Sequence, residues 1–361
     1  MALLDRKIQP DVNALLKVIR RTEMPERVHH IELFLDEEIK QQLCRRFDLD
    51  KQVPADSPYP QLHRDIVLHS FLGYDIFCVP LAATAFAIKT IPAADTTVVA
   101  DQKRSAREWF DEHTGPIQSW EDFEKYPWPN VNDIDLRPFE WLDKHLPPNM
   151  GCYDLTAHIL EMATWLLGYE TLCLKTYDQP DLVNAIFEKV GNFYIEYTRT
   201  LCDFCCVKVI WGSDDMGFRT GTLVSPQFLR DTVLPWHRRC ARIAHANNRP
   251  YLLHACGQLA DITDDLIDYV GVDARHSYED AIMPVTEAKK LYGHRMAILG
   301  GIDMDFLCRA DEHRIRKRVT DTLNICSANG GYCLGTGNTV ANYVPVENYL
   351  VMLDEGRRFL L

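Results

Sequence analysis

One short stretch of the chain combines two side chains that bind metal ions, His254 and Cys256 in His254-Ala255-Cys256-Gly257. The two residues are two positions apart, so in an extended strand both side chains point to the same side. An imidazole nitrogen and a thiolate sulfur form a donor pair that suits Zn2+. A buried histidine beside a buried structural cysteine is the alternative for so short a pattern. Because the pair follows a predicted strand, and Cys333 ends another, we favour a metal site that includes all three.

Further polar side chains follow other predicted strands. Asp214 and Asp215 lie in the polar turn 212–215 that follows the β-branched run 207–211, and we predict that they orient the substrate or transfer its proton. Solvated turn residues are the alternative for such a pair. Glu279 follows the run 272–277 and is a further candidate metal ligand. The candidate substrate contacts are Glu32, Arg219 and His276.

These residues need a scaffold that gathers strand ends at one place. Apolar, strand-like runs alternate with helical patterns along the 361 residues. The runs are 29–34, 74–79, 151–155, 207–211, 251–254, 272–277, 296–302 and 331–334. This alternation predicts an α/β fold, a (β/α)8 barrel in which residues 1–361 form one domain and the chemistry lies at the carboxyl ends of the strands. The amphipathic stretch 11–23 predicts an N-terminal helical extension, and residues 92–148 fit no single unit, which predicts an insertion at the rim.

Composition excludes several classes of protein. The 39 Lys and Arg residues against 52 Asp and Glu residues give a net charge of -13, which argues against a nucleic-acid or anionic-membrane binder. No apolar run approaches the roughly 18 residues of a membrane helix, and the N-terminus lacks the apolar core of a signal peptide. We therefore expect a cytoplasmic protein. Its 12 cysteines are too few for a disulfide scaffold, and we expect thiols, including a structural group at Cys202, Cys205 and Cys206.

Several longer stretches are similar to the uroporphyrinogen decarboxylase superfamily. They are 25–34, 126–129, 214–220, 225–237, 253–257 and 338–348, and they span most of the chain. The resemblance implies the same (β/α)8 barrel. It also implies one of two activities, because the superfamily contains porphyrinogen decarboxylases, which use no metal, and zinc methyltransferases, which work with corrinoid proteins.

Two features favour the methyltransferase branch. The decarboxylases carry an arginine-rich segment after the first strand, which holds substrate carboxylates. Here residues 36–38 read Asp-Glu-Glu, and an acidic segment would repel a porphyrinogen that carries eight carboxylates. The methyltransferases carry His-x-Cys-Gly at strand five, and residues 254–257 match that motif. The match implies Zn2+ bound by His254 and Cys256.

The third zinc ligand departs from the family pattern. In the methyltransferases it is a cysteine near the end of strand eight, and that position falls near Asn338 here. Cys333 lies several residues earlier, so either the turn contains a gap or the ligand differs. Glu279 and Glu32 are the alternatives to Cys333.

The resemblance implies a zinc methyltransferase that moves a methyl group between a small methylated substrate and a cobalamin. No corrinoid-binding Asp-x-His-x-x-Gly motif occurs, so the cobalamin is expected on a separate corrinoid protein that docks at the barrel rim. The departure at Cys333 favours O-demethylation of a methyl ether over methyl transfer to coenzyme M. A metal-free decarboxylase and a non-catalytic, metal-binding partner of a corrinoid system are the alternatives.

Overall fold

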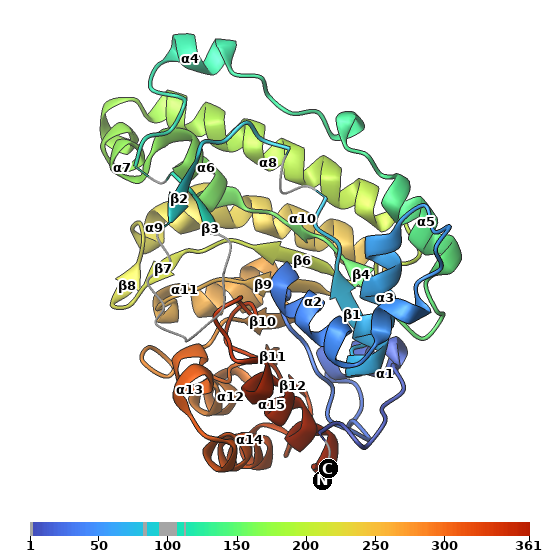
Figure 1. Ribbon diagram of the computed structural model, residues 1–361. Helices are drawn as coiled ribbons and strands as arrows, with labels where there is room; N and C mark the ends of the chain where they lie inside the picture. Colours follow the sequence, from blue (N-terminus) through green and yellow to red (C-terminus); the bar gives the residue numbers. More distant parts are fainter. Residues whose placement is uncertain (1–2, 82–84, 94–106, 112) are drawn as a thin grey trace.

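Parallel strands form the centre of the computed structural model, which describes residues 3–81, 85–93, 107–111 and 113–361 (Figure 1). The strands are β1 (Ile76–Cys78), β4 (Gly151–Tyr153), β5 (Leu155–Thr156), β6 (Ile210–Ser213), β9 (Tyr251–His254), β10 (Ala274–His276), β11 (Ala297–Leu299) and β12 (Tyr332–Cys333). Six of them pair in the order β12-β11-β10-β9-β6-β5, and β1 pairs with β4. A bridge between Cys152 and Val207 connects these two groups. The predicted (β/α)8 barrel is confirmed.

Helices cover the outside of the strands (Figure 1). They are α2 (Glu37–Arg46), α3 (Pro60–Leu72), α5 (Arg137–His145), α6 (Ile159–Leu167), α7 (Tyr169–Asp178), α8 (Pro180–Cys202), α9 (Pro226–Phe228), α10 (Leu234–Ala246), α11 (Ala260–Asp264), α12 (Val285–Tyr292), α13 (Met304–Arg309), α14 (Glu312–Cys326) and α15 (Val346–Arg358). Among the described residues, no helix combines the length and the apolar character that crossing a bilayer requires.

The predicted insertion lies between β1 and β4. It contains the antiparallel pair β2 (Thr90–Ala93) and β3 (Arg107–Phe110), followed by α4 (Trp120–Lys125) and α5. Ser119 begins α4 because its side chain accepts a hydrogen bond from the Asp122 amide. Residues 94–106 and 112 of the insertion lie outside the described part of the chain.

The first barrel segment, residues 29–35, differs from the regular strand predicted there. It makes single parallel bridges, from His30 to Leu334 and from Leu35 to Val340. Its other side is attached through side chains. His29 Nδ1 lies 2.7 Å from an Asp75 carboxylate oxygen, and the Tyr153 hydroxyl donates to the carbonyl oxygens of Glu32 and Leu33. We call this line of contacts the seam.

The N-terminal helix α1 (Val12–Ile19) closes the barrel at the amino ends of the strands. The Val12 amide donates to the Asn149 carbonyl, and Arg20 donates to the Asn248 carbonyl; both acceptors come just before a strand. Its apolar side chains, Leu15 among them, are buried with the inward-facing residues of the strands. The predicted helical extension therefore closes one end, and the site must lie at the other.

Shortening Leu15 tests how much this closure contributes. Leu15 is fully buried, so Leu15→Ala should lower the free energy of unfolding by about 2–5 kcal/mol through lost burial and the cavity left behind. Denaturant unfolding followed by circular dichroism measures the change. The matched variant Leu174→Ala, at a side chain that is 57% exposed, should change stability by less than about 0.5 kcal/mol. Equal effects of the two variants would contradict the closing role of α1.

Candidate functional site

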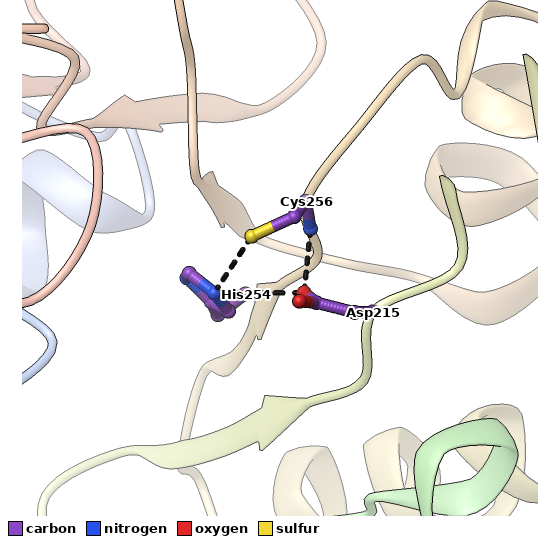
Figure 2. Close-up of side chains that lie close together, drawn as sticks. All are labelled: Asp215, His254 and Cys256. Atoms are coloured by element: carbon purple, nitrogen blue, oxygen red, sulfur yellow. Dashed lines mark hydrogen bonds and ion pairs between the residues drawn. The ribbon is translucent and has the colours of Figure 1, made fainter. Parts of the chain in front are cut away.

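Asp215, His254 and Cys256 meet at the carboxyl ends of β6 and β9 (Figure 2). One ligand atom from each residue lies within 4.8 Å of the other two. Cys256 Sγ is 3.4 Å from His254 Nε2, and an Asp215 carboxylate oxygen is 3.7 Å from the same nitrogen. The Cys256 amide donates to Asp215 at 2.8 Å, which fixes the carboxylate against the loop. This end of the barrel is where barrel enzymes have their active sites.

Gly257 explains how the loop after Cys256 is shaped. Its φ is +86°, and a Cβ there would lie 2.1 Å from the carbonyl carbon of Gly217. Gly217 belongs to a small hairpin of β7 (Gly217–Phe218) and β8 (Gly221–Thr222), which packs on the loop. Only glycine permits both the backbone conformation and this close approach. Arg219, a predicted substrate contact, lies exposed between β7 and β8 and is not part of the cluster.

A chain of hydrogen bonds sets the tautomer of His254. His276 Nε2 lies 3.0 Å from the Thr336 carbonyl oxygen, which can only accept, so this nitrogen carries a proton. In a neutral ring His276 Nδ1 then accepts, and it lies 2.8 Å from His254 Nδ1, which must donate. His254 Nε2 is left with a lone pair, and it faces Cys256 and Asp215. His276 therefore orients the ring of His254, and its predicted contact with substrate stays a prediction.

The electrostatics of the cluster fit a cation. Burial lowers the pKa of His254 to about 3, so the ring is neutral at physiological pH. Burial and the Asp215 carboxylate raise the pKa of Cys256 well above its ordinary value. The three residues thus offer a neutral nitrogen, a carboxylate and a thiol that ionises when a positive charge enters. That donor set suits a divalent metal ion.

Two further side chains contact the sulfur of Cys256. The Ser277 hydroxyl donates to Sγ at 3.2 Å, and the Asn338 amide donates to it at 3.6 Å. Ser277 has a φ of +85°, a conformation that costs a residue other than glycine about 1–3 kcal/mol and clusters at functional sites. Asn338 follows β12 and brings an amide, not a second thiolate, to the sulfur of Cys256.

The structure does not bring Cys333 into this cluster. Cys333 is fully buried in the barrel interior, packed with apolar strand residues. Burial raises its pKa, with a further contribution from Asp75, which directly precedes β1. The side chain therefore lies inside the barrel, toward the amino ends of the strands, and not at the end where Asp215, His254 and Cys256 meet.

Neither glutamate proposed as a substitute belongs to the cluster. The Glu32 carboxylate accepts hydrogen bonds from the Thr336 amide and hydroxyl and holds the turn before Asn338; burial raises its pKa to about 8. Glu279 is half-buried, and burial raises its pKa, with a further contribution from Asp303. Glu279 is therefore outside the cluster, although Asp215 also contributes to its raised pKa.

Asp214 has a different role from its neighbour Asp215. It is fully buried, and its carboxylate accepts from the amides of Leu160 and Glu161 at the start of α6. His237 Nε2 lies 2.8 Å from the same carboxylate. With these partners Asp214 anchors the start of α6 and lies outside the cluster; its catalytic role stays a prediction.

Two polar residues not predicted from the sequence lie near the cluster: His158, which follows β5, and Glu161, in the first turn of α6. His158 Nδ1 is 3.1 Å from a Glu161 carboxylate oxygen. The pair is within electrostatic reach of the cluster, because His158 lowers the pKa of His254 and Asp215 raises that of Glu161. The same rule that singled out His254, a polar residue just after a predicted strand, applies to His158 after 151–155.

Comparison with known proteins agrees with this architecture. A methylated-thiol–coenzyme M methyltransferase from Methanosarcina mazei is 22% identical over 281 residues, 74% of this chain and 73% of that protein. A solved structure of a methyltransferase from Methanosarcina mazei superposes with a TM-score of 0.71 at 16% identity, covering 96% of this chain and 98% of that one. A putative vitamin-B12 independent methionine synthase from Listeria monocytogenes has a TM-score of 0.51 at 13% identity, covering 93% and 96%. These two structures share the fold.

The family assignment follows from the sequence. Residues 116–359 match the family described as uroporphyrinogen decarboxylase. The match covers well over half of the 361 residues and includes Asp215, His254 and Cys256. The resemblance seen in the sequence is confirmed, and the chain belongs to the uroporphyrinogen decarboxylase family.

Proposed function

We propose that this protein is a zinc-dependent methyltransferase that moves the methyl group of a small methyl ether to a Co(I) corrinoid carried by a separate protein. The observation that carries the proposal is the cluster of Asp215, His254 and Cys256, with the lone pair of His254 Nε2 directed into it. The relative named as a methyltransferase supports the class of reaction.

Zinc fits the donors that the cluster offers. His254 would bind through Nε2, Cys256 through Sγ and Asp215 through its carboxylate. Catalytic zinc sites use three protein ligands and keep a further position for water or substrate. When bound, the ion acts as a Lewis acid toward an oxygen of the substrate.

The donor set favours an ether over a thiol as substrate. The residue beside Cys256 Sγ is Asn338, so the cluster has one sulfur, and its third donor is the Asp215 carboxylate. A single thiolate transfers less charge to the metal than two do. Ser277 and Asn338 reduce that charge further by donating hydrogen bonds to the sulfur. A more electrophilic metal is better suited to polarising an ether oxygen.

The remaining residues hold these groups in place. Thr336 and His276 fix the ring of His254, and the Cys256 amide fixes Asp215. The corrinoid protein is the proposed partner, and the carboxyl end of the barrel is the proposed docking face, because the cobalt must reach the methyl carbon there.

The first prediction of the proposed function concerns the metal site. Wild-type protein purified without chelator should contain about one zinc per chain, and Cys256→Ala should lose nearly all of it. Asp215→Asn should weaken zinc binding by at least about tenfold, since loss of an outer-shell partner alone costs about 10–100-fold. Elemental analysis and competition with a chromogenic chelator measure both effects.

Cys333→Ala is the matched control for the loss of a cysteine. It should leave the zinc content unchanged, and X-ray absorption at the zinc edge should show a single sulfur neighbour. Zinc loss in Cys333→Ala, or a first shell with two sulfurs, would exclude the ligand set proposed here.

The reaction makes the second prediction. With reduced cobalamin under anaerobic conditions, aryl methyl ethers should give methylcobalamin and the free phenol, followed by absorbance and chromatography. Cys256→Ala should reduce the rate by at least about 10²-fold, because the metal that polarises the ether oxygen is lost. Turnover of methylated thiols without any turnover of ethers would refute the ether assignment while keeping methyl transfer.

A third prediction separates the two branches of the family. Uroporphyrinogen III should not be converted to coproporphyrinogen in an anaerobic assay. The reason is the acidic segment 36–38, in which Glu37 pairs with Arg64 and so occupies a guanidinium that could hold a substrate carboxylate. Conversion at an ordinary enzymatic rate would assign the protein to the decarboxylases.

A further inference from the structure

We infer that His158, oriented by Glu161, is a general acid that gives a proton to the oxygen of the leaving group as the methyl group is transferred. The inference rests on the proposed function. It adds a catalytic residue from the segment after β5, which supplies none of the three members of the cluster.

The backbone places His158 at the mouth of the barrel. His158 immediately precedes α6 and follows β5, at the same end of the barrel as Asp215 and His254. Ala157, the residue before it, has a φ of +54°, a strained conformation of the kind that clusters at functional sites. Asp214 accepts two amide hydrogen bonds from the start of α6, which fixes this helix relative to Asp215.

Within the described part of the chain, one nitrogen of His158 contacts a carboxylate and the other has no hydrogen-bond partner. Its side chain is 19% exposed, and its ring is near those of Trp165 and Tyr194, with centroid distances of 6.1 and 6.0 Å. Nδ1 is 3.1 Å from Glu161, whose carboxylate accepts its proton. The proton that a charged ring can give away is therefore the one on Nε2.

Carboxylates from several elements support a charged His158. Glu161 on α6, Asp214 after β6 and Asp154 between β4 and β5 together raise the pKa of His158, against the effect of burial. Burial and Asp215 raise the pKa of Glu161 to about 7. His254 on β9 does not oppose this charge, because burial lowers its pKa to about 3 and its ring is neutral near pH 7. The pair therefore holds a proton near neutral pH, as a general acid requires.

The step balances with the proposed partners. The bond between the methyl carbon and the ether oxygen breaks, and its electron pair stays on the oxygen. The methyl carbon forms a bond to cobalt with the electron pair of the Co(I) corrinoid, which becomes methyl-Co(III). The oxygen takes the proton from His158 Nε2 and leaves as an alcohol or phenol, and His158 regains a proton from water.

A series of aryl methyl ethers tests this role, because a poor leaving group needs the proton and a good one does not. His158→Gln keeps a donor for Glu161 but cannot give a proton from Nε2. Compared with wild type, it should slow ethers of weakly acidic phenols by about 10²–10⁴-fold and ethers of strongly acidic nitrophenols much less. His245→Gln, which removes the histidine of a separate histidine–aspartate pair with Asp273, should leave the whole series unchanged.

The outcomes separate the inference from the proposed function. A uniform loss across the series, or no loss, in His158→Gln overturns the inference and leaves the function intact. Absence of ether turnover in wild-type protein overturns the function and this inference with it. Zinc content and thermal unfolding of each variant show whether a loss of rate comes from a damaged site.

A measurement without turnover tests the pairing itself. The imidazole nitrogen signals of His158, assigned by their loss in His158→Gln, should titrate above the ordinary range of histidine in wild-type protein. Glu161→Gln should lower that midpoint by about one unit or more, since it removes the hydrogen-bonded carboxylate. An unchanged midpoint would overturn the role given to Glu161.

Discussion

The lone pair on His254 Nε2 depends on two hydrogen bonds that end at one backbone carbonyl. The Thr336 carbonyl accepts the proton of His276 Nε2, and His276 Nδ1 in turn accepts the proton of His254 Nδ1. The Thr336 amide and hydroxyl are held by the buried carboxylate of Glu32. A ligand geometry on β9 is therefore set by residues from the first barrel segment, from β10 and from the turn after β12. The same turn presents Asn338 to the sulfur of Cys256, so one loop conformation governs both the nitrogen and the sulfur of the site.

The adjacent aspartates after β6 divide two tasks that their sequence does not distinguish. Asp214 faces away from the cluster and binds the start of α6 and His237, and Asp215 faces Cys256. Consecutive side chains on an extended segment point to opposite sides, which explains the division. Through Asp214 the helix that carries Glu161 is fixed to the same loop that carries Asp215. Glu161 and Asp215 are thus attached to the same short segment of the chain.

Much of the barrel could be predicted from the sequence, because buried parallel strands and amphipathic helices have different hydrophobic periods. The pair at 254 and 256 could be found for a similar reason, since two positions on one strand share a side. The position of Cys333 could not be predicted. A strand pattern gives the side to which a residue points, and not its height along the axis of a barrel whose strands are staggered. The roles of Asp214 and Asn338 depend on contacts between distant elements, which one sequence does not reveal. His158 could have been identified from the sequence, because it is a polar residue that follows the strand-like run 151–155.

At the seam, the attachment of residues 29–35 to the neighbouring strands depends on the identity of particular side chains. Elsewhere the strands are joined by backbone hydrogen bonds, which any residue except proline can make. Along the seam the attachment passes through the Tyr153 hydroxyl and the carboxylate of Asp75. Substitutions there would weaken the attachment of residues 29–35 while leaving every backbone ladder intact. Because Asp75 directly precedes β1, its contact with His29 lies near the end of the barrel that α1 closes, so this part of the seam can vary without touching the metal cluster at the other end.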